Sequence, residues 1–222
     1  MSDVCISTSA APTYLPAYQF KVERRSYNLI DGGVAANNPT SVAIGEMMKK
    51  LLKEKCSDPS IKPTDTRKLL VISLGTGFTK GKQFEAPMAA KWGLMGWLYK
   101  NGSNPIFDCF AEANADMVDF YTSVLFRMLG CEEKNYLRIQ DDTLTPTAAS
   151  VDISTEENLK ELLNIGELLL KKPVSRVDLQ TGKYTAVKVQ GKEETNADAL
   201  TQFAKLLSEE KKTKEIVRGE KN

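Results

Sequence analysis

The 222-residue sequence contains no histidine. Neither a Ser-His-Asp nor a Cys-His catalytic arrangement can therefore form within it, because no imidazole is present to transfer the proton. Zinc sites with histidine ligands are excluded for the same reason, which leaves only all-cysteine or carboxylate metal sites. We expect neither a metal ion nor another cofactor.

Cysteine is also scarce. The four residues, Cys5, Cys56, Cys109 and Cys131, are widely separated and form no CxxC pair. Neither a thiolate metal site nor a disulfide scaffold is therefore indicated. We expect reduced and mostly buried thiols, as in a cytosolic protein.

The sequence has no large excess of charge and no long hydrophobic run. Thirty basic residues stand against 29 acidic ones, which gives no electrostatic reason to expect nucleic acid as a partner. No apolar run reaches the roughly 20 residues that cross a bilayer, and the N-terminus lacks the features of a signal peptide. With 41% hydrophobic residues, the composition is that of a globular protein. We expect a cytoplasmic protein that is able to associate with membranes.

Short apolar segments predict a set of β-strands. Val4 and Ile6 alternate with polar residues, as in a strand. The segment 68–74 is almost continuously apolar, which suits a central strand covered on both faces. Further strands are expected at 27–30, at 136–140 and, as a hairpin, within 174–189.

Apolar residues at helical spacing predict helices between these strands, which together indicate an α/β fold. Asn38 is a good N-cap for the first helix, and Ser154 with Glu157 forms a capping-box pattern before another. The expected helices span 39–55, 92–98, 105–129, 156–171 and 196–217. The aromatic and methionine stripes of the second and third helices fit a buried core better than a lipid-binding surface.

A carboxylate followed by two glycines is the first candidate for a chemical role. Asp31 follows an expected strand and precedes Gly32 and Gly33, whose missing side chains let another group approach the backbone closely. From the spacing alone, an Asx-turn in which Asp31 caps its own loop is the more ordinary interpretation.

Two other polar segments also have ordinary interpretations. The Gly-Thr-Gly sequence at 75–77 has neither a Walker lysine nor a GxGxxG pattern, so a plain strand-to-loop exit is favoured over an anion site. Ser7, Thr8 and Ser9 carry hydroxyls, but no GxSxG motif places a serine on a nucleophile turn. We interpret these hydroxyls as turn and backbone-binding groups.

Several longer segments occur in a specific order along the chain. They read CISTSAAPTYLP at 5–16, NLIDGGVAANNP at 28–39 and LGTG at 74–77, followed by 135–140, 169–174 and 203–207. Together they resemble the plant patatin-like family of lipid acyl hydrolases, and the resemblance extends over essentially the whole chain. It implies a three-layer α/β fold with helices on both faces of a central sheet. Residues 1–45 would then be the C-terminal end of the catalytic domain, and residues 46–222 a C-terminal region on the same core.

The resemblance implies a role for Asp31 and accounts for the lack of histidine. Patatin-like enzymes use a serine–aspartate dyad, in which the aspartate itself acts as the base. The Asp-Gly-Gly sequence formed by Asp31, Gly32 and Gly33 is similar to the family's motif, which would make Asp31 the proton acceptor. The implied substrates are membrane phospholipids or galactolipids, cleaved through an acyl-serine intermediate.

The chain also departs from the family's pattern. The family's glycine-rich oxyanion loop and its GxSxG serine lie upstream of the matching region, and the 222 residues contain neither. We therefore expect an N-terminally truncated member that has the base, lacks the nucleophile and is inactive alone. The alternative is a non-catalytic protein that binds a lipid surface, a homologue or a second copy through an exposed sheet edge.

Overall fold

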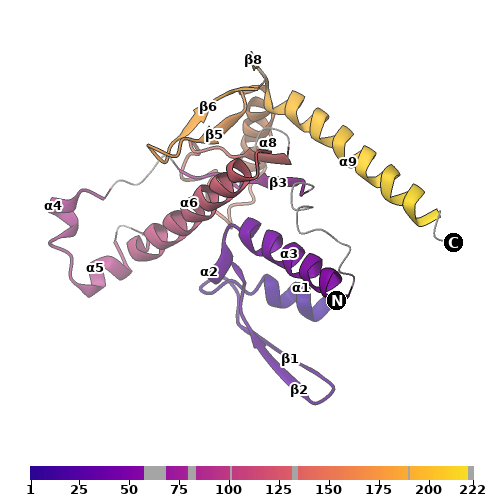
Figure 1. Cartoon of the computed structure of the whole chain (residues 1–222). Helices are drawn as coiled ribbons and strands as arrows, with labels where there is room; N and C mark the ends of the chain where they lie inside the picture. Colours follow the sequence, from indigo (N-terminus) through magenta and orange to yellow (C-terminus); the bar gives the residue numbers. More distant parts are fainter. Residues whose placement is uncertain (58–68, 80–83, 101, 132–134, 190, 220–222) are drawn as a thin grey trace. The chain divides into compact units, whose positions relative to one another are not determined.

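The chain folds into two compact units, shown in the computed structural model of Figure 1. The structure describes residues 1–57, 69–79, 84–100, 102–131, 135–189 and 191–219. Unit 1 comprises Met1–Lys53 and Glu85–Asp119, and unit 2 comprises Glu54–Phe84 and Phe120–Asn222. The two units are interleaved along the sequence, because each contains two separate segments. The predicted domains 1–45 and 46–222 stay a prediction.

Unit 1 begins with a helix, and the strand predicted around Val4 and Ile6 is wrong. Helix α1 spans Ser2–Thr8, and the Cys5 amide donates to the carbonyl of Met1 at 3.1 Å. The side chains of Val4 and Ile6 are both exposed. Two alternating apolar residues are too few to distinguish a strand from an exposed helical turn.

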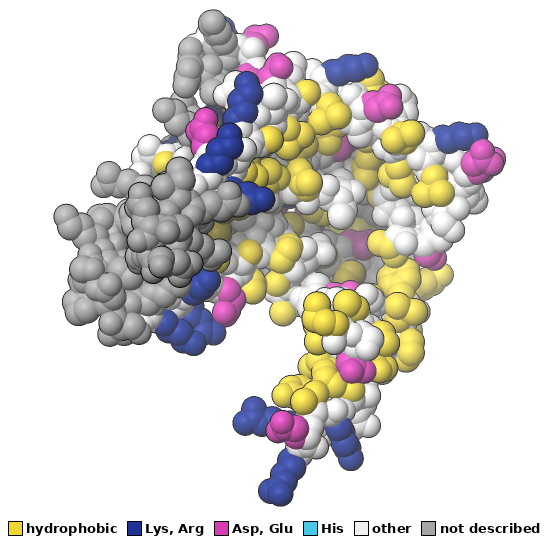
Figure 2. All heavy atoms as spheres, turned by 90° about the vertical axis from the view of Figure 1, so that its right-hand side faces the viewer, with side chains coloured by type: hydrophobic (Ala, Val, Ile, Leu, Met, Phe, Trp, Pro, Cys, Tyr) yellow, Lys and Arg dark blue, Asp and Glu magenta, His cyan; other side chains and the backbone are white. Residues whose placement is uncertain are grey.

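A β-hairpin follows α1. Strand β1 (Tyr18–Val22) pairs antiparallel with β2 (Arg25–Leu29), which confirms most of the predicted strand at 27–30. The paired residues Phe20 and Tyr27 stack with 5.0 Å between their ring centroids. Figure 2 shows apolar side chains along the hairpin, which lies at the bottom of that view, and Lys and Arg at its tip.

Among the described residues, five further helices begin in unit 1, and two of them, α3 and α6, continue into unit 2. They are α2 (Gly33–Ala36), α3 (Thr40–Ser57), α4 (Ala86–Ala89), α5 (Leu94–Leu98) and α6 (Pro105–Met128). The side-chain oxygen of Asn38 accepts a hydrogen bond from the Thr40 amide at 3.2 Å, as expected of a residue that caps α3. The predicted helices at 39–55, 92–98 and 105–129 are confirmed to within two residues at each end.

Helix α6 buries the opposite face from the one predicted. Its apolar stripe is exposed in unit 1, where Ile106, Phe110 and Met117 are 51%, 56% and 48% accessible. Its buried face carries Ala115 and Asp119 instead. In α5, Leu94, Met95 and Leu98 are exposed as well, while Trp97 is half-buried. The expectation that these stripes form a core is therefore wrong for unit 1, because helical spacing identifies an apolar face but not what covers it.

Among its described residues, unit 2 contains a parallel strand pair, two small antiparallel pairs and two long helices. Strand β3 (Val71–Leu74) pairs in parallel with β4 (Tyr136–Ile139). The remaining elements are α8 (Glu156–Lys171), β5 (Ser175–Val177), β6 (Tyr184–Ala186), β7 (Lys188–Val189), β8 (Lys192–Glu193) and α9 (Asn196–Gly219). Pairing of β5 with β6 confirms the predicted hairpin.

The core of unit 2 forms on both faces of β4. On one face, Leu137 and Ile139 pack with Val174 and Phe203, beneath helices α8 and α9. On the other face, Tyr136 stacks on the fully buried Phe126 of α6, with 5.1 Å between ring centroids. All four residues of β4 are buried.

Strand β3 was predicted to be buried on both faces, but one of its faces is exposed. Ile72 and Leu74 are exposed, and Ser73 is its one buried residue. Each sheet that the described residues form has two strands. The structure is therefore a mixed α/β fold with small sheets, while the three-layer arrangement stays a prediction.

The cap of α8 is also corrected. Its N-cap is Thr155, whose hydroxyl accepts a hydrogen bond from the Asn158 amide at 3.3 Å, and not Ser154. The helix itself has the predicted bounds, 156–171. Two neighbouring hydroxyl residues are equally good caps by type, so the sequence does not decide between them.

The cysteines are less buried than expected. Cys5 and Cys109 are exposed and Cys131 is half-buried, while the side chain of Cys56 lies outside the described part of the chain. In addition, no helix among the described residues has the length and hydropathy needed to cross a membrane.

Candidate functional site

The loop that carries Asp31 is fixed by its backbone. Strand β2 ends at Leu29, and the Asp31 amide donates a 2.9 Å hydrogen bond to the carbonyl of Ala10. Ala10 is itself buried and follows α1 closely. This hydrogen bond therefore joins the segments 5–16 and 28–39, two of those whose sequences resemble the patatin-like family.

The carboxylate of Asp31 is held by the second glycine of its motif. Its Oδ1 accepts a hydrogen bond from the Gly33 amide at 2.6 Å, which is the Asx-turn expected from the spacing. The side chain is half-buried. No hydrogen bond to the other oxygen, Oδ2, comes from the residues that the structure describes. One oxygen thus fixes the orientation, and the other is available to accept a proton.

The two glycines after Asp31 are not equivalent. A Cβ at Gly33 would lie 3.0 Å from Asp31 Oδ1 and 3.7 Å from its Cγ, whereas a Cβ at Gly32 meets no atom within 4 Å. Any side chain at position 33 would therefore press on the carboxylate. Gly32 has the right-handed helical conformation, with φ of −64°, so alanine fits there.

A buried polar pair supports the same region. The Asn38 amide nitrogen donates to Asp119 Oδ1 at 2.9 Å, and both side chains are buried. Because Asn38 also caps α3, the pair ties the segment after Asp31 to helix α6 within unit 1. Sequence reasoning found Asn38 only as a cap and missed Asp119. Its position in the sequence could have indicated it, because Asp119 shares one face of α6 with the small residues Ala115 and Thr122.

Two of the three N-terminal hydroxyls, those of Ser7 and Ser9, have the predicted role of binding the backbone, and that of Thr8 stays a prediction. Ser7 Oγ donates to the carbonyl of Asp3 at 2.6 Å, and Ser9 Oγ donates to that of Cys5 at 2.9 Å. Both bonds run to the residue four positions earlier, as in a helix. Each serine hydroxyl thus donates its proton to a backbone carbonyl and not to a side chain that could act as a base.

The Gly-Thr-Gly loop at 75–77 is filled by protein and leaves no anion cradle at its glycine amides. The Gly75 amide donates to the Ile139 carbonyl at 2.9 Å, and the Gly77 amide donates to Gln140 Oε1 at 3.2 Å. A Cβ at Gly75 would collide with the Gln140 side chain at 1.5 Å. Gly77 has φ of +87°, which favours glycine. The plain exit from β3 is therefore the better interpretation.

A separate ion pair in unit 2 fixes the loop after β4. The buried Asp141 carboxylate accepts from Lys172 Nζ at 2.7 Å, and from the Thr143 amide and hydroxyl at 2.8 and 2.6 Å. Burial by itself raises the pKa of Asp141, but the hydrogen bonds from Lys172 and Thr143 outweigh it and lower the pKa below its ordinary value.

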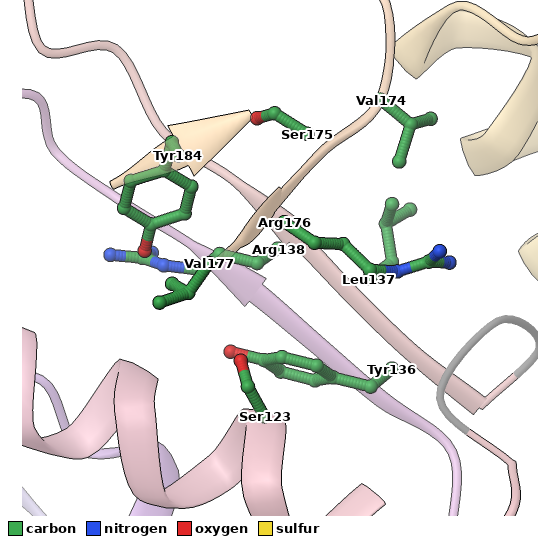
Figure 3. A pocket seen from close by; sticks show the side chains of 9 residues that line it. All are labelled: Ser123, Tyr136, Leu137, Arg138, Val174, Ser175, Arg176, Val177 and Tyr184. Carbon is green, nitrogen blue, oxygen red and sulfur yellow. The ribbon is translucent and has the colours of Figure 1, made fainter. Parts of the chain in front are cut away.

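A small pocket lies in unit 2, as Figure 3 shows. Side chains from α6, β4, β5 and β6 line it, among them Ser123, Tyr136, Arg138 and Tyr184. Its cavity volume is about 10 Å³, which is the space of about one water molecule. An acyl chain does not fit there, and none of the predicted site residues lines it.

The predicted site residues Asp31, Gly32 and Gly33 thus form one local turn in unit 1. Among the described residues, no cluster of three or more Cys, Asp or Glu side chains could hold a metal ion. A GxSxG serine is absent from the sequence itself. The turn therefore offers a fixed carboxylate, and by itself it can accept a proton but not attack an ester.

Comparison with known proteins gives a consistent group of relatives. Patatin-like protein 3 of Arabidopsis thaliana is 51% identical over 221 residues, which are 97% of this chain and 51% of the relative. Patatin-like protein 2 of Oryza sativa subsp. japonica is 49% identical over 223 residues, 97% of this chain and 54% of the relative. A potato protein named probable inactive patatin-3-Kuras 1 is 36% identical over 96% of this chain and 53% of its own length.

No protein-family model matches the chain. The chain spans about half the length of the curated relatives it matches. At this identity over nearly all of its residues, it belongs to the patatin-like family and corresponds to about half of such a protein.

Proposed function

We propose that this chain is the base-carrying part of a lipid acyl hydrolase of the phospholipase A or galactolipase type. The observation that carries the proposal is the Asp31 carboxylate, which the Gly33 amide orients through Oδ1 while Oδ2 stays available. The family and the absence of histidine from the sequence support the same role. Glycerolipids of membranes are the proposed substrates.

In the proposed reaction, Asp31 takes the proton of a serine hydroxyl while the serine oxygen attacks the ester carbonyl carbon. The tetrahedral intermediate collapses, the alcohol leaves with the proton from Asp31, and an acyl-serine remains. Asp31 then takes a proton from water, whose oxygen attacks the acyl carbon. The fatty acid is released, and the proton returns to the serine.

The serine of this dyad is proposed to come from the half of a patatin-like protein that the chain does not match. Loss of the nucleophile from a serine hydrolase costs on the order of 10⁶ in turnover. The loss of an oxyanion donor costs roughly a further 10²–10³ in an otherwise intact site. The 222 residues alone are therefore expected to be inactive.

Reconstitution of the missing part tests the proposal. The half of Arabidopsis Patatin-like protein 3 that the chain does not match is fused to this chain, and hydrolysis of a p-nitrophenyl ester is measured. We expect activity in the fusion and none in the 222 residues alone. Asp31→Asn should reduce kcat about 10²–10⁴-fold, as for loss of a general base, while the control Asp142→Asn at an exposed position should not.

A fluorescent fluorophosphonate, which labels activated serines, gives the second readout. The fusion should be labelled, and its Asp31→Asn variant should be labelled much more slowly. Labelling of the 222 residues alone would show an activated serine within them and contradict the proposal. A fusion whose activity survives Asp31→Asn would contradict the role of Asp31.

The second candidate function is a non-catalytic protein of the same family. The sequence without GxSxG and a 36% identical relative that is named probable inactive favour it. In that case a folded fusion hydrolyses no ester and is not labelled, and any binding to lipid vesicles is the same in Asp31→Asn.

A further inference from the structure

A short segment of unit 1, which contains helices α4 and α5, exposes large apolar side chains. On α5, Leu94 and Met95 are 76% and 74% accessible. Three further exposed side chains of this segment are those of Met88, Leu98 and Tyr99. These residues lie close together in the chain, which distinguishes them from apolar residues that are scattered singly over a surface.

The two tryptophans of the chain, Trp92 and Trp97, support this segment from within. Both are half-buried, and their rings pack edge to face with 5.3 Å between centroids. A Cβ at Gly96 would lie 2.9 Å from the Cβ of Trp92, so glycine permits Trp92 to pack on α5. Lys100 Nζ lies 5.9 Å from the centroid of the Trp92 ring, which is a cation–π contact. These contacts are local to unit 1, and they leave the apolar side chains of α5 exposed.

The same segment carries positive charge and no negative charge. From residue 86 to residue 107 the sequence contains Lys91 and Lys100 but neither aspartate nor glutamate, although 29 of the 222 residues of the chain are acidic. Both lysines are exposed. An apolar surface with a lysine on either side of α5 is electrostatically complementary to a negatively charged partner.

This combination of side chains fits a membrane surface better than another protein. Tryptophan, tyrosine and lysine are suited to the boundary of a bilayer, because each has an apolar body that contacts lipid and a polar end that reaches water. Lysines near a membrane are attracted to anionic lipids. Interfaces between proteins, by contrast, are depleted in lysine. The partner that matches both the apolar side chains and the charge is therefore a bilayer with anionic head groups.

We infer that the segment 88–100 docks on a membrane surface that contains anionic lipid. Leu94 and Met95 enter the boundary between the head groups and the acyl chains. Lys91 and Lys100 contact the phosphates of the head groups. The inference goes beyond the proposed reaction, because docking requires neither Asp31 nor a nucleophile.

Tryptophan fluorescence tests the inference directly, because both tryptophans of the chain lie in this segment. The full chain is titrated with vesicles of phosphatidylcholine and phosphatidylglycerol in equal amounts, and with vesicles of phosphatidylcholine alone. With the mixed vesicles, we expect the emission to shift to shorter wavelength and to be quenched when the acyl chains carry bromine. Affinity for phosphatidylcholine alone should be at least about tenfold lower, since both lysines then lack an anionic partner.

Two matched pairs of substitutions locate the contact. Leu94→Ser and its control Leu163→Ser change leucines that are 76% and 66% accessible. Lys91→Glu and its control Lys183→Glu reverse the charge of exposed lysines. Leu94→Ser and Lys91→Glu should each weaken binding to the mixed vesicles about tenfold, whereas the controls should leave it unchanged. Circular dichroism of each variant alone verifies that the fold is retained.

Three results would overturn the inference. One is an emission that the mixed vesicles do not shift, or that brominated lipid does not quench, because the tryptophans would then lie away from the bilayer. Another is equal binding to both kinds of vesicle, or equal effects of a substitution and its control. The third is a homodimer, or a complex with the unmatched half of a patatin-like protein, that Leu94→Ser dissociates in size-exclusion chromatography, because a protein would then cover this surface. None of these results bears on Asp31, whose role the fusion tests separately.

Discussion

Two of the four phenylalanines in helix α6 have opposite surroundings. Phe126 in unit 2 is fully buried and stacks on Tyr136, whereas Phe110 in unit 1 is 56% accessible. The difference extends to the units themselves. The buried apolar residues described in unit 1 are Ala10, Ile44, Pro105 and Ala115, while those of unit 2 include large aromatic and branched side chains.

The comparison indicates that the two units are stabilised by different interactions. Unit 2 has a packed core, whose burial is the main source of stability in proteins. In unit 1, few large side chains are buried. We therefore expect hydrogen bonds such as those of Asn38 with Asp119 and of Asp31 with Ala10 to contribute a larger fraction of the stability than in unit 2. Such hydrogen bonds contribute about 0.5–1.5 kcal/mol each.

The two phenylalanines provide the largest expected effect. Phe126→Ala should lower the free energy of unfolding of unit 2 by about 3–5 kcal/mol, because it leaves a cavity beside Tyr136. Phe110→Ala should change stability by less than about 0.5 kcal/mol, as at other exposed positions. Urea titration with hydrogen exchange of the β4 amides measures both. Equal effects of the two substitutions would contradict the contrast between the units.

The ion pair of unit 2 should give the next largest effect. Asp141→Asn is expected to cost about 1–3 kcal/mol at pH 7, since hydrogen bonds to a charged group are lost. Because the pKa of Asp141 is lowered in the folded state, its contribution is present above the ordinary carboxyl pKa. It is lost as the pH falls through the lowered value.

Urea titration of wild type and Asp141→Asn between pH 7 and pH 2 checks this dependence. The difference between the two proteins should be constant down to about pH 5 and shrink below about pH 4. Asp142→Asn, at an exposed position next to it, is the control and should give no such difference. A difference that grows at low pH would have the wrong sign.

The cap of α8 should give a smaller effect. Thr155→Ala removes the hydroxyl that accepts from the Asn158 amide and should cost about 0.5–2 kcal/mol. Ser154→Ala should have almost no effect, since Ser154 is not the N-cap. Thermal unfolding of both variants compares them, and a larger loss for Ser154→Ala would restore the original capping prediction.

The two glycines of the Asp31 turn should give the smallest effect. Gly32→Ala should stabilise unit 1 by about 0.4–1 kcal/mol, because it restricts the unfolded chain and meets no atom within 4 Å. Gly33→Ala should lose this gain, because its Cβ would lie 3.0 Å from Asp31 Oδ1. Hydrogen exchange of α2 and α3 amides measures the difference, and equal stabilisation by both substitutions would contradict it.

Local signals in the sequence predicted the elements well, but not their exposure. The helix at 156–171 was predicted with its observed bounds, because polar caps and Pro173 mark both ends. Strand β1 and helix α1 were missed or misassigned, since their apolar patterns are short. The exposure of Phe110 and Leu74 was not predictable, because burial depends on segments distant in the sequence.

The candidate site was predictable in position but not in role. Residue type and the flanking glycines identified the Asp31 turn, and the structure shows the expected hydrogen bond from Gly33. Its role as a base rests on the family resemblance and stays a prediction. The support from Asn38 and Asp119 joins residues far apart in the chain, and no local pattern announces such a pair.

The pairing of β3 with β4 also sets an order of events during synthesis. Val71 is in register with Tyr136, 65 positions later in the chain. A ribosome that adds about 5–20 residues per second needs roughly 3–13 s to cover this interval. Until then, the apolar segment of β3 has left the ribosome without its neighbour and is exposed to pairing with other nascent chains. We therefore expect the yield of folded protein to depend on this waiting time as well as on the stability of the folded state.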